Sequence, residues 1–159
     1  MPPSFPTVVH LLADTAATWP GREALAMGKE RLTYADTLAC VSGFASELGE
    51  VRGERIAMLL PNGTELCIAI HAAHAAGAQV VPLNPLYTAR ELEGILADAA
   101  PAVLIHGGEP HAESLARRLR IPRSTYSLSR RARTRSSSVM AQRRSNNFSG
   151  FSVSAGSSR

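Results

Sequence analysis

The sequence predicts an α/β fold, specifically an incomplete N-terminal part of a doubly wound parallel-sheet domain that is followed by a basic tail. Two observations favour this fold. Between residues 55 and 106, short apolar runs alternate with amphipathic stretches of helical length, which is the order of right-handed βαβ units. The strand-like runs are also continuously apolar, as expected when helices cover both faces of a sheet.

Capping residues and helix breakers delimit the expected elements. Thr33 can accept from the first free N–H groups of a helix, and Thr88 with Glu91 three residues later forms a capping box. Gly49 and Gly77 are typical helix stops. In chain order we expect a helix over 7–19, a hairpin of strands 23–27 and 31–33, a helix over 33–49, a strand over 55–60, a helix over 64–76, a strand over 79–83, a helix over 88–99, a strand over 102–106 and a helix over 109–119.

The charge distribution divides the chain into two chemically different pieces. Residues 1–116 contain 6 Lys+Arg against 13 Asp+Glu, a net charge of −7, whereas residues 117–159 contain 11 Arg and no acidic residue, a net charge of +11. Helical and strand periodicity end near Pro122, and few large apolar residues follow. Such a composition cannot offset its chain entropy by burial. We therefore expect a domain over 1–120 and a disordered Arg/Ser-rich tail over 121–159.

Cysteine usage and the absence of targeting signals favour a cytoplasmic protein. Cys40 and Cys67 have no partner at metal-ligand spacing and lie in apolar helical patterns, so we expect buried free thiols. The N-terminus lacks the basic and apolar regions of a signal peptide. No segment reaches the roughly 18 apolar residues that a membrane-spanning helix needs.

Four segments, taken together and in this order, resemble one enzyme family. They are LTYAD at 32–36, RGERIAMLLPN at 52–62, AAGAQVVPLNP at 75–85 and NPLYTAREL at 84–92. The first three resemble the motifs LTYAEL, GDRVAILLPN and GAVVVPLNP of AMP-forming acyl-CoA synthetases. The fourth is most similar to the long-chain fatty-acid–CoA ligase branch. The resemblance covers about a hundred residues and implies an N-terminal portion of this family.

The resemblance also implies a chemistry for which this chain lacks the groups. Family members use ATP and Mg²⁺ to form an acyl-adenylate, and the thiol of CoA then displaces AMP. A phosphate loop similar to YTSGTTGxPKG, a later YGxTE segment and a lysine of a C-terminal domain carry out these steps in the family. None of the three occurs here, and the one lysine is Lys29, in a predicted turn. We therefore assign no catalytic, cofactor-binding or metal-binding residue and expect no cofactor for this chain alone.

The residues that carry the resemblance most sharply are Asn84, Pro85 and Tyr87. Two interpretations are open for them. They can end a strand and lead into the next helix, which Asn and Pro do commonly. Alternatively, they can contact substrate directly. We favour the structural role, because the family uses this part of the chain as scaffold.

Two further features are candidates for binding. His71 and His74 are three residues apart on one predicted helix and can face one site, as a metal pair would. No additional ligand stands at suitable spacing, which favours packing or solvated positions. Gly107-Gly108 lies between a strand and a helix, where anions can bind. It lacks the remainder of a dinucleotide or Walker pattern, so an ordinary turn is the preferred interpretation.

The arginine-rich tail has three interpretations. It can be translated out of the ancestral reading frame, since frame-shifted GC-rich coding sequence yields Arg, Ser and Ala. It can be a divergent linker. It can also be an arm that binds nucleic acid or an acidic membrane surface through phosphate neutralisation, at least weakly and without specificity. A further hypothesis is a split synthetase, in which a complementing chain supplies the remainder of the enzyme.

Overall fold

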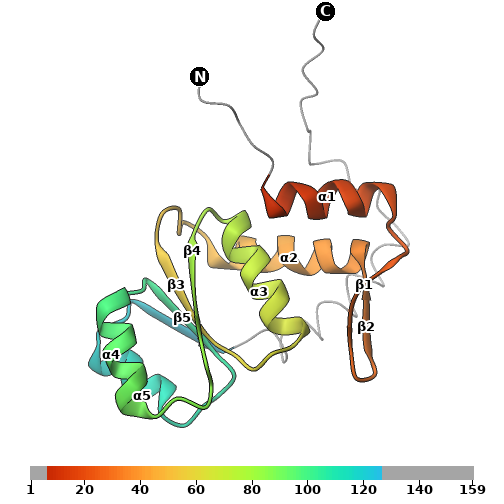
Figure 1. Cartoon of the computed structure of the whole chain (residues 1–159). Helices are drawn as coiled ribbons and strands as arrows, with labels where there is room; N and C mark the ends of the chain where they lie inside the picture. The colour runs from red at the N-terminus through yellow and green to blue at the C-terminus, as the bar shows by residue number, and fades with distance from the viewer. Residues whose placement is uncertain (1–6, 127–159) are drawn as a thin grey trace, which may run out of the picture.

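The computed structural model describes residues 7–126 and shows a parallel sheet with helices on both faces, beside a two-stranded hairpin (Figure 1). The mixed α/β architecture of a partial domain, predicted from the alternation of apolar runs, is confirmed. The elements are α1 (Val8–Thr18), β1 (Glu23–Met27), β2 (Glu30–Thr33), α2 (Tyr34–Leu48), β3 (Arg55–Leu59), α3 (Thr64–Ala75), β4 (Gln79–Leu83), α4 (Ala89–Ala99), β5 (Val103–His106), α5 (Ala112–Arg118) and β6 (Arg123–Tyr126).

The sheet has the strand order β4-β3-β5-β6, and its paired strands are all parallel. Ile56 of β3 pairs with Val80 on one side and with Val103 on the other, so β3 and β5 are the central strands of the described sheet. The chain moves outward from β3 to β4 through α3. It then crosses back over β3 through α4 to reach β5, and continues through α5 to β6. This reversal of direction defines a doubly wound sheet.

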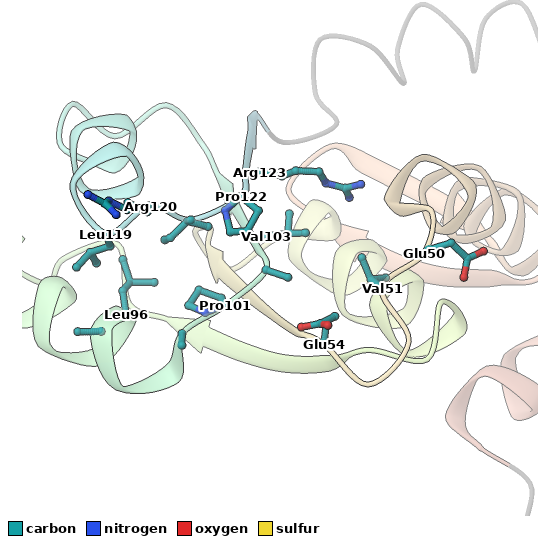
Figure 2. Close-up of a pocket in the computed structure, with 14 residues that line it drawn as sticks. Glu50, Val51, Glu54, Leu96, Pro101, Val103, Leu119, Arg120, Pro122 and Arg123 are labelled. Atoms are coloured by element: carbon teal, nitrogen blue, oxygen red, sulfur yellow. The ribbon is translucent and has the colours of Figure 1, made fainter.

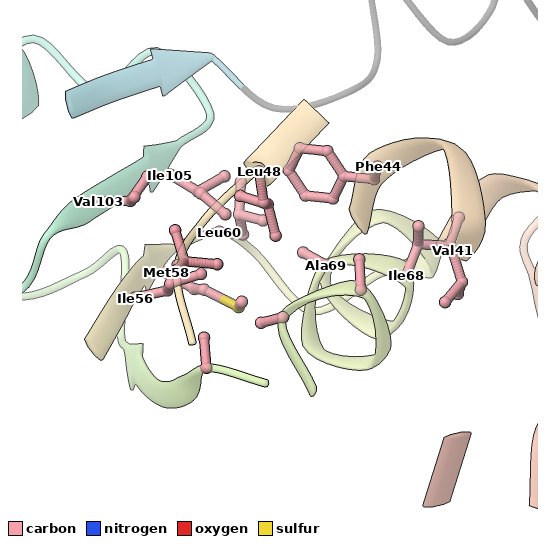
Figure 3. Packing of buried hydrophobic residues seen from close by; sticks show 14 of the residues in the cluster. Val41, Phe44, Leu48, Ile56, Met58, Leu60, Ile68, Ala69, Val103 and Ile105 are labelled. Carbon is pink, nitrogen blue, oxygen red and sulfur yellow. The ribbon is translucent and has the colours of Figure 1, made fainter. Parts of the chain in front are cut away.

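The two faces of the sheet are covered by different helices. Alternate residues of a strand point to opposite faces, and Ile56 and Met58 accordingly pack with α2 and α3, whereas Ala57 and Leu59 pack with α4 and α5. Figure 3 shows side chains of α2 lying over β3 and β5 in the first of these two clusters. The central strands are thus apolar on both sides, which explains their continuous hydrophobic runs.

The hairpin and the helix starts agree with the caps predicted from the sequence. The side chain of Thr33 accepts from the backbone N–H of Asp36, and Thr88 with Glu91 forms a reciprocal capping box. The hairpin is tied to the sheet domain by the hydroxyl of Thr64, which donates to a carboxylate oxygen of Glu30 at 2.6 Å. These local bonds explain why the predicted and observed boundaries of α2 and α4 agree closely.

Helix α5 begins later than the sequence predicted, at Ala112 instead of residue 109. Proline disfavours a helical conformation in the residue before it, and Pro110 therefore excludes Glu109 from the helix. The N–H of Ala112 bonds to the carbonyl of Glu109 at 3.0 Å, which closes a single turn before the helix proper.

Strand β6 corrects the predicted boundary of the domain at residue 120. Its residues pair in parallel with β5, and the N–H of Arg123 donates to the carbonyl of Ala102 at 3.2 Å. The sequence placed this segment in the disordered tail because RSTY has no apolar run. The remaining tail, residues 127–159, lies outside the described residues. The predicted disorder there stays a prediction.

Two further expectations concern the cysteines and membrane spans. Cys40 and Cys67 are free, as predicted, but both are half-buried instead of fully buried. Burial and the nearby carboxylate of Asp36 raise the pKa of the Cys40 thiol. Among residues 7–126, no helix combines the length and the apolar character needed to cross a bilayer.

Candidate functional site

The carboxyl edge of the parallel sheet is the first place to seek a site. Ligands of doubly wound sheets bind outside the carboxyl ends of the strands, at the point where the strand order reverses. Here that point lies between β3 and β5, because α3 leaves β3 on one face while α4 and α5 pack on the other (Figure 1). His106 ends β5 and pairs in register with Leu59, the last residue of β3, and Asn62 follows three residues later, so these residues lie at the carboxyl edge.

His106 is the titratable group most deeply placed at this edge. Its relative exposure is 1%, and it pairs in register with Leu59. Burial lowers the pKa of its imidazole, while the carboxylates of Glu109 and Glu113 oppose that shift. The Nδ1 atom accepts from the N–H of Gly108 at 3.3 Å. Through this hydrogen bond, the imidazole of His106 is part of the turn that follows β5.

The Gly107-Gly108 turn engages its own amides. The N–H of Gly107 is shared between the carbonyl of Leu59 at 3.2 Å and the Glu109 carboxylate at 3.0 Å. The N–H of Gly108 bonds to His106, as described above. A phosphate cradle needs such amides to point at the ligand. In this structure they are directed into the turn, and the Glu109 carboxylate occupies the position that an anion would take.

Asn84, Pro85 and Tyr87 form the connection from β4 to α4. The carbonyl of Asn84 accepts from the N–H of Tyr87 at 3.1 Å, and its side-chain oxygen accepts from the N–H of Leu86 at 3.0 Å. Asn84 therefore begins a turn, Pro85 occupies the second position that proline favours, and Thr88 then caps α4. Leu86 and Tyr87 are exposed to 89% and 39%. These contacts support the structural interpretation of the three residues.

The structure does not unite the two histidines of α3 with further metal ligands. The ring of His71 is hydrogen-bonded through Nδ1 to the carbonyl of Cys67 at 2.8 Å, whereas His74 is exposed. Among residues 7–126, no three His, Cys, Asp or Glu side chains come together in a group that could hold a metal ion. Lys29 lies in the exposed turn of the hairpin, far along the chain from the carboxyl edge.

A cavity of about 620 Å³ lies at the opposite, amino edge of the sheet (Figure 2). Figure 2 shows Glu50 and Glu54 on one side of it and Arg120 on the other. Between these charged groups the wall is mostly apolar and comes from α4, from the first residues of β5 and β6, and from the loops before β3, before β5 and after α5. Its volume is in the range of small-molecule pockets. Its charged lining residues are Glu50, Glu54, Arg120 and Arg123, and the guanidinium group of Arg123 already donates to the carbonyl of Leu48.

Two arginines at this amino edge bond to helix ends. Arg55, the first residue of β3, donates to the carbonyl of Ala99 at the end of α4 at 3.1 Å. Arg123, the first residue of β6, donates to the carbonyl of Leu48 at the end of α2 at 2.7 Å. The last carbonyls of a helix lack intrahelical partners and carry a partial negative charge. These guanidinium groups therefore stabilise helix ends.

Four of the eleven arginines in the basic segment 117–159 belong to the described fold. Arg117 and Arg118 are in the last turn of α5, Arg120 follows it, and Arg123 starts β6. Arg118 also pairs with Glu93 of α4 at 2.6 Å. The remaining seven lie beyond residue 126. The positive charge available for an interaction outside the domain is therefore smaller than the sequence suggested.

Comparison with known proteins agrees with a doubly wound domain of a nucleotide-using enzyme. The family model described as "AMP-binding enzyme" matches residues 12–150. This match covers most of the chain, and the protein belongs to the AMP-binding enzyme family. The matched range also extends past residue 120, where the composition changes.

The relatives by sequence include CoA ligases of more than one kind. The chain is 37% identical over 102 residues to a long-chain-fatty-acid–CoA ligase of Bacillus subtilis, an alignment that covers 62% of this chain and 18% of that protein. It is 34% identical over 129 residues to an oxalate–CoA ligase of Arabidopsis thaliana, covering 77% of this chain and 25% of the relative. The chain thus spans about a fifth to a quarter of the length of these relatives.

Two solved structures are similar to this chain in both fold and sequence. The fatty acyl CoA synthetase of Mycobacterium tuberculosis superposes with a TM-score of 0.67 and 28% identity, over 80% of this chain and 28% of that one. VinN in complex with L-aspartate superposes with a TM-score of 0.70 and 28% identity, over 87% of this chain and 35% of that one. The predicted resemblance to acyl-CoA synthetases is confirmed.

Sequence reasoning overlooked two groups that the structure makes prominent, His106 and Arg123. His106 is the last residue of a buried strand, and a polar residue that ends an apolar run at the carboxyl edge was a usable signal. Arg123 had no comparable signal, because its role depends on the end of α2, 75 residues away in the sequence.

Proposed function

We propose that this chain is the N-terminal scaffold portion of an AMP-forming acyl-CoA ligase and that these residues alone catalyse no reaction. In the complete family the reaction is ATP-dependent ligation of a carboxylic acid to CoA, and a fatty acid is the substrate class we favour. The carrying observation is the family match over residues 12–150 together with fatty-acid–CoA ligases among the relatives. A cytoplasmic location is part of the same proposal.

The residues at the carboxyl edge do not fit ATP, Mg²⁺ or CoA. The amides of the Gly107-Gly108 turn are hydrogen-bonded within the turn, and the carboxylate of Glu109 lies beside them. Transfer of an adenylyl group develops negative charge on phosphate oxygens, which requires positioned donors and cations. The Arg55 and Arg123 guanidinium groups bond to helix ends at the opposite edge. We therefore derive no catalytic step from this chain.

Exchange of labelled pyrophosphate into ATP tests the proposal. The purified chain is assayed with fatty acids of several chain lengths, with a complete fatty-acid–CoA ligase as the positive control. Loss of a single oriented donor costs about two orders of magnitude in rate, so a chain without the phosphate loop should show no exchange above the blank. Exchange that depends on fatty acid and survives further purification would contradict the proposal.

The same assay addresses the split-enzyme hypothesis. Addition of a polypeptide that supplies the remaining part of a ligase should restore exchange if the two chains associate productively. The downstream DNA, translated in its other two frames, shows whether a Ser/Thr/Gly-rich loop followed by lysine is encoded. That reading also tests the prediction that residues 121–159 arise from a shifted frame.

Weak binding of polyanions is a second candidate function, favoured by the seven arginines beyond residue 126. Lys and Arg that neutralise phosphates release counterions, which makes the binding strongly salt-dependent. The chain and a version lacking residues 127–159 are compared on heparin along a salt gradient. We expect the complete chain to elute later and the shortened version to elute with little retention. Equal elution would exclude the tail as the binding element.

A further inference from the structure

The cavity at the amino edge of the sheet takes no part in the proposed function. Four of its lining residues, Val51, Leu96, Pro101 and Val103, are apolar and buried. They come from the loop before β3, from α4, from the loop before β5 and from β5 itself. Ligands of doubly wound sheets bind at the carboxyl edge, which lies at the other ends of the same strands. A molecule in this cavity would therefore contact none of the residues at that edge.

The charged groups of the lining are balanced, two of each sign. The charged lining residues are Glu50, Glu54, Arg120 and Arg123. The guanidinium group of Arg123 is engaged, because it donates to the carbonyl of Leu48 at 2.7 Å. Among residues 7–126, the side chains of Glu50, Glu54 and Arg120 form no ion pair and no hydrogen bond. Two carboxylates and one guanidinium group are thus available to a ligand.

The available charges of opposite sign come from different parts of the chain. Glu50 and Glu54 belong to the loop before β3, and Arg120 follows α5. Figure 2 shows the two glutamates on one side of the cavity and Arg120 on the other, with apolar side chains between them. Such a lining is complementary to a molecule whose positive and negative groups are separated by an apolar part.

Three other classes of ligand fit this lining less well. A nucleotide would bring several negative charges to a cavity with two available carboxylates and one available guanidinium group. A metal ion needs more ligands, and among residues 7–126 no three His, Cys, Asp or Glu side chains come together to hold one. A fatty acid would pair with Arg120, but its alkyl end would remove the carboxylates of Glu50 and Glu54 from water without a partner.

The backbone of Arg120 is fixed by the end of α5. Its φ angle is 54°, in the left-handed region where helices commonly end on glycine. Its N–H donates to the carbonyl of Arg117 at 3.2 Å, and the N–H of Ile121 donates to the carbonyl of Ala116 at 2.9 Å. These backbone bonds hold the turn without the guanidinium group. Because a side chain is unfavourable in this conformation, the turn itself gives no reason for an arginine.

We propose that the amino-edge cavity binds an ω-amino acid, in which an ammonium group and a carboxylate stand at the two ends of an alkyl chain. The ammonium group pairs with the carboxylates of Glu50 and Glu54, and the ligand's carboxylate accepts hydrogen bonds from the guanidinium group of Arg120. The alkyl chain lies on the apolar wall between them. This binding is independent of the ligase reaction, because no residue of the carboxyl edge takes part in it.

Titration of the complete, isotope-labelled chain, followed by NMR, tests both the ligand class and its location. The probes are straight-chain ω-amino acids from aminohexanoate to aminododecanoate, each compared with the alkylamine and the alkanoate of the same length. We expect the best ω-amino acid to bind about twofold to fivefold more tightly than either single-charge probe, the effect of one exposed ion pair. The amide signals of Val103 and Ile121 should shift. A single-charge probe that binds as tightly, or shifts confined to Gly107 and its neighbours, would overturn the proposal.

A short peptide presents the same two charged groups, so trileucine is a further probe. Its spacer contains peptide groups, whose N–H and C=O would lie against the apolar wall without partners. We therefore expect trileucine to bind more weakly than the best ω-amino acid. Stronger binding of trileucine would contradict the assignment of an alkyl spacer.

Two substitutions then separate the two ends of the ligand. Glu54→Gln keeps the shape of the side chain and should weaken binding of the ω-amino acid and the alkylamine about twofold to fivefold, with the alkanoate unchanged. Arg120→Gly should weaken binding of the ω-amino acid and the alkanoate instead, and glycine suits the left-handed backbone at this position. Asp14→Asn is the control, because Asp14 is exposed on α1 and does not line the cavity.

The pattern across the three probes decides the outcome. If Glu54→Gln and Arg120→Gly affect the ω-amino acid, the alkylamine and the alkanoate alike, or no more than Asp14→Asn does, these charges do not orient the ligand and the proposal is wrong. Circular dichroism confirms that the variants retain their helix content. Should a variant fail to fold, the comparison of the three probes on the unmodified chain decides the matter.

Discussion

Strands β5 and β6 are neighbours in the same sheet but are held there by different interactions. The four residues of β5, VLIH, are all buried and contact helices on both faces. β6 reads RSTY, and its first two residues are exposed. Backbone bonds to β5 and one guanidinium bond to the end of α2 hold β6 in place. The comparison shows that a central strand depends on apolar burial, whereas an outer strand can depend on register and a single polar contact.

The largest expected effect comes from the apolar side chains of β5. Leu104 is fully buried between β3 and the helices α4 and α5. Leu104→Ala should lower the free energy of unfolding by about 2–5 kcal/mol, because it removes apolar burial and leaves a cavity. Urea unfolding measures the change.

Ser124→Ala is the control for Leu104→Ala on β6, since the Ser124 side chain is exposed. Surface substitutions of this kind usually change stability by about 0.5 kcal/mol or less. Equal effects of the two substitutions would show that β5 and β6 do not differ in the way described here.

A smaller effect is expected from the arginine that connects β6 to α2. Arg123→Ala removes the donor to the carbonyl of Leu48 and should cost about 1.5 kcal/mol, the lower end of the range for hydrogen bonds that involve a charged group. Arg90→Ala is the control, because Arg90 is exposed near the start of α4, where a positive charge is not favoured. Unfolding by urea distinguishes the two. If Arg123→Ala costs no more than Arg90→Ala, β6 is held by its ladder alone.

The smallest expected effect is a dependence of stability on pH at the end of β5. The folded protein lowers the pKa of His106 below its ordinary value of 6.5, so the unfolded chain binds a proton first as the pH falls. The contribution is therefore fully present above pH 6.5 and declines as the pH drops below it. The opposing charges of Glu109 and Glu113 limit the size of the effect.

Stability measured between pH 8 and pH 5 in the original chain and in His106→Asn tests this sign. The decline below pH 6.5 should be smaller in the variant. His74→Asn serves as the control substitution, because the side chain of His74 is exposed on α3. A steeper decline in His106→Asn than in the original chain would mean that the imidazole is favoured in its charged form.

The structural role of several residues at the candidate site could be predicted from the sequence. Asn84, Pro85 and Thr88 act within a few residues of themselves, so turn and cap propensities identified their roles. His106 was overlooked because its environment combines β3, α5 and a glycine turn, which no local window contains. The amino-edge cavity could not be predicted, since its wall combines α4, the first residues of β5 and β6, and three loops that only the packing brings together.

The sequence alone determined the order of the helices and strands from α1 to α5, the parallel α/β class and the resemblance to acyl-CoA synthetases. Hydrophobic periodicity, capping residues and helix breakers act within a few residues of the chain, so they can be recognised in the sequence. The buried strands can be recognised as well, because burial on both faces requires a continuous apolar run. The tertiary structure alone decided that RSTY forms a strand and that Arg123 bonds to the end of α2. Those features depend on which backbone groups lie opposite each other, and partners distant in the sequence determine that pairing.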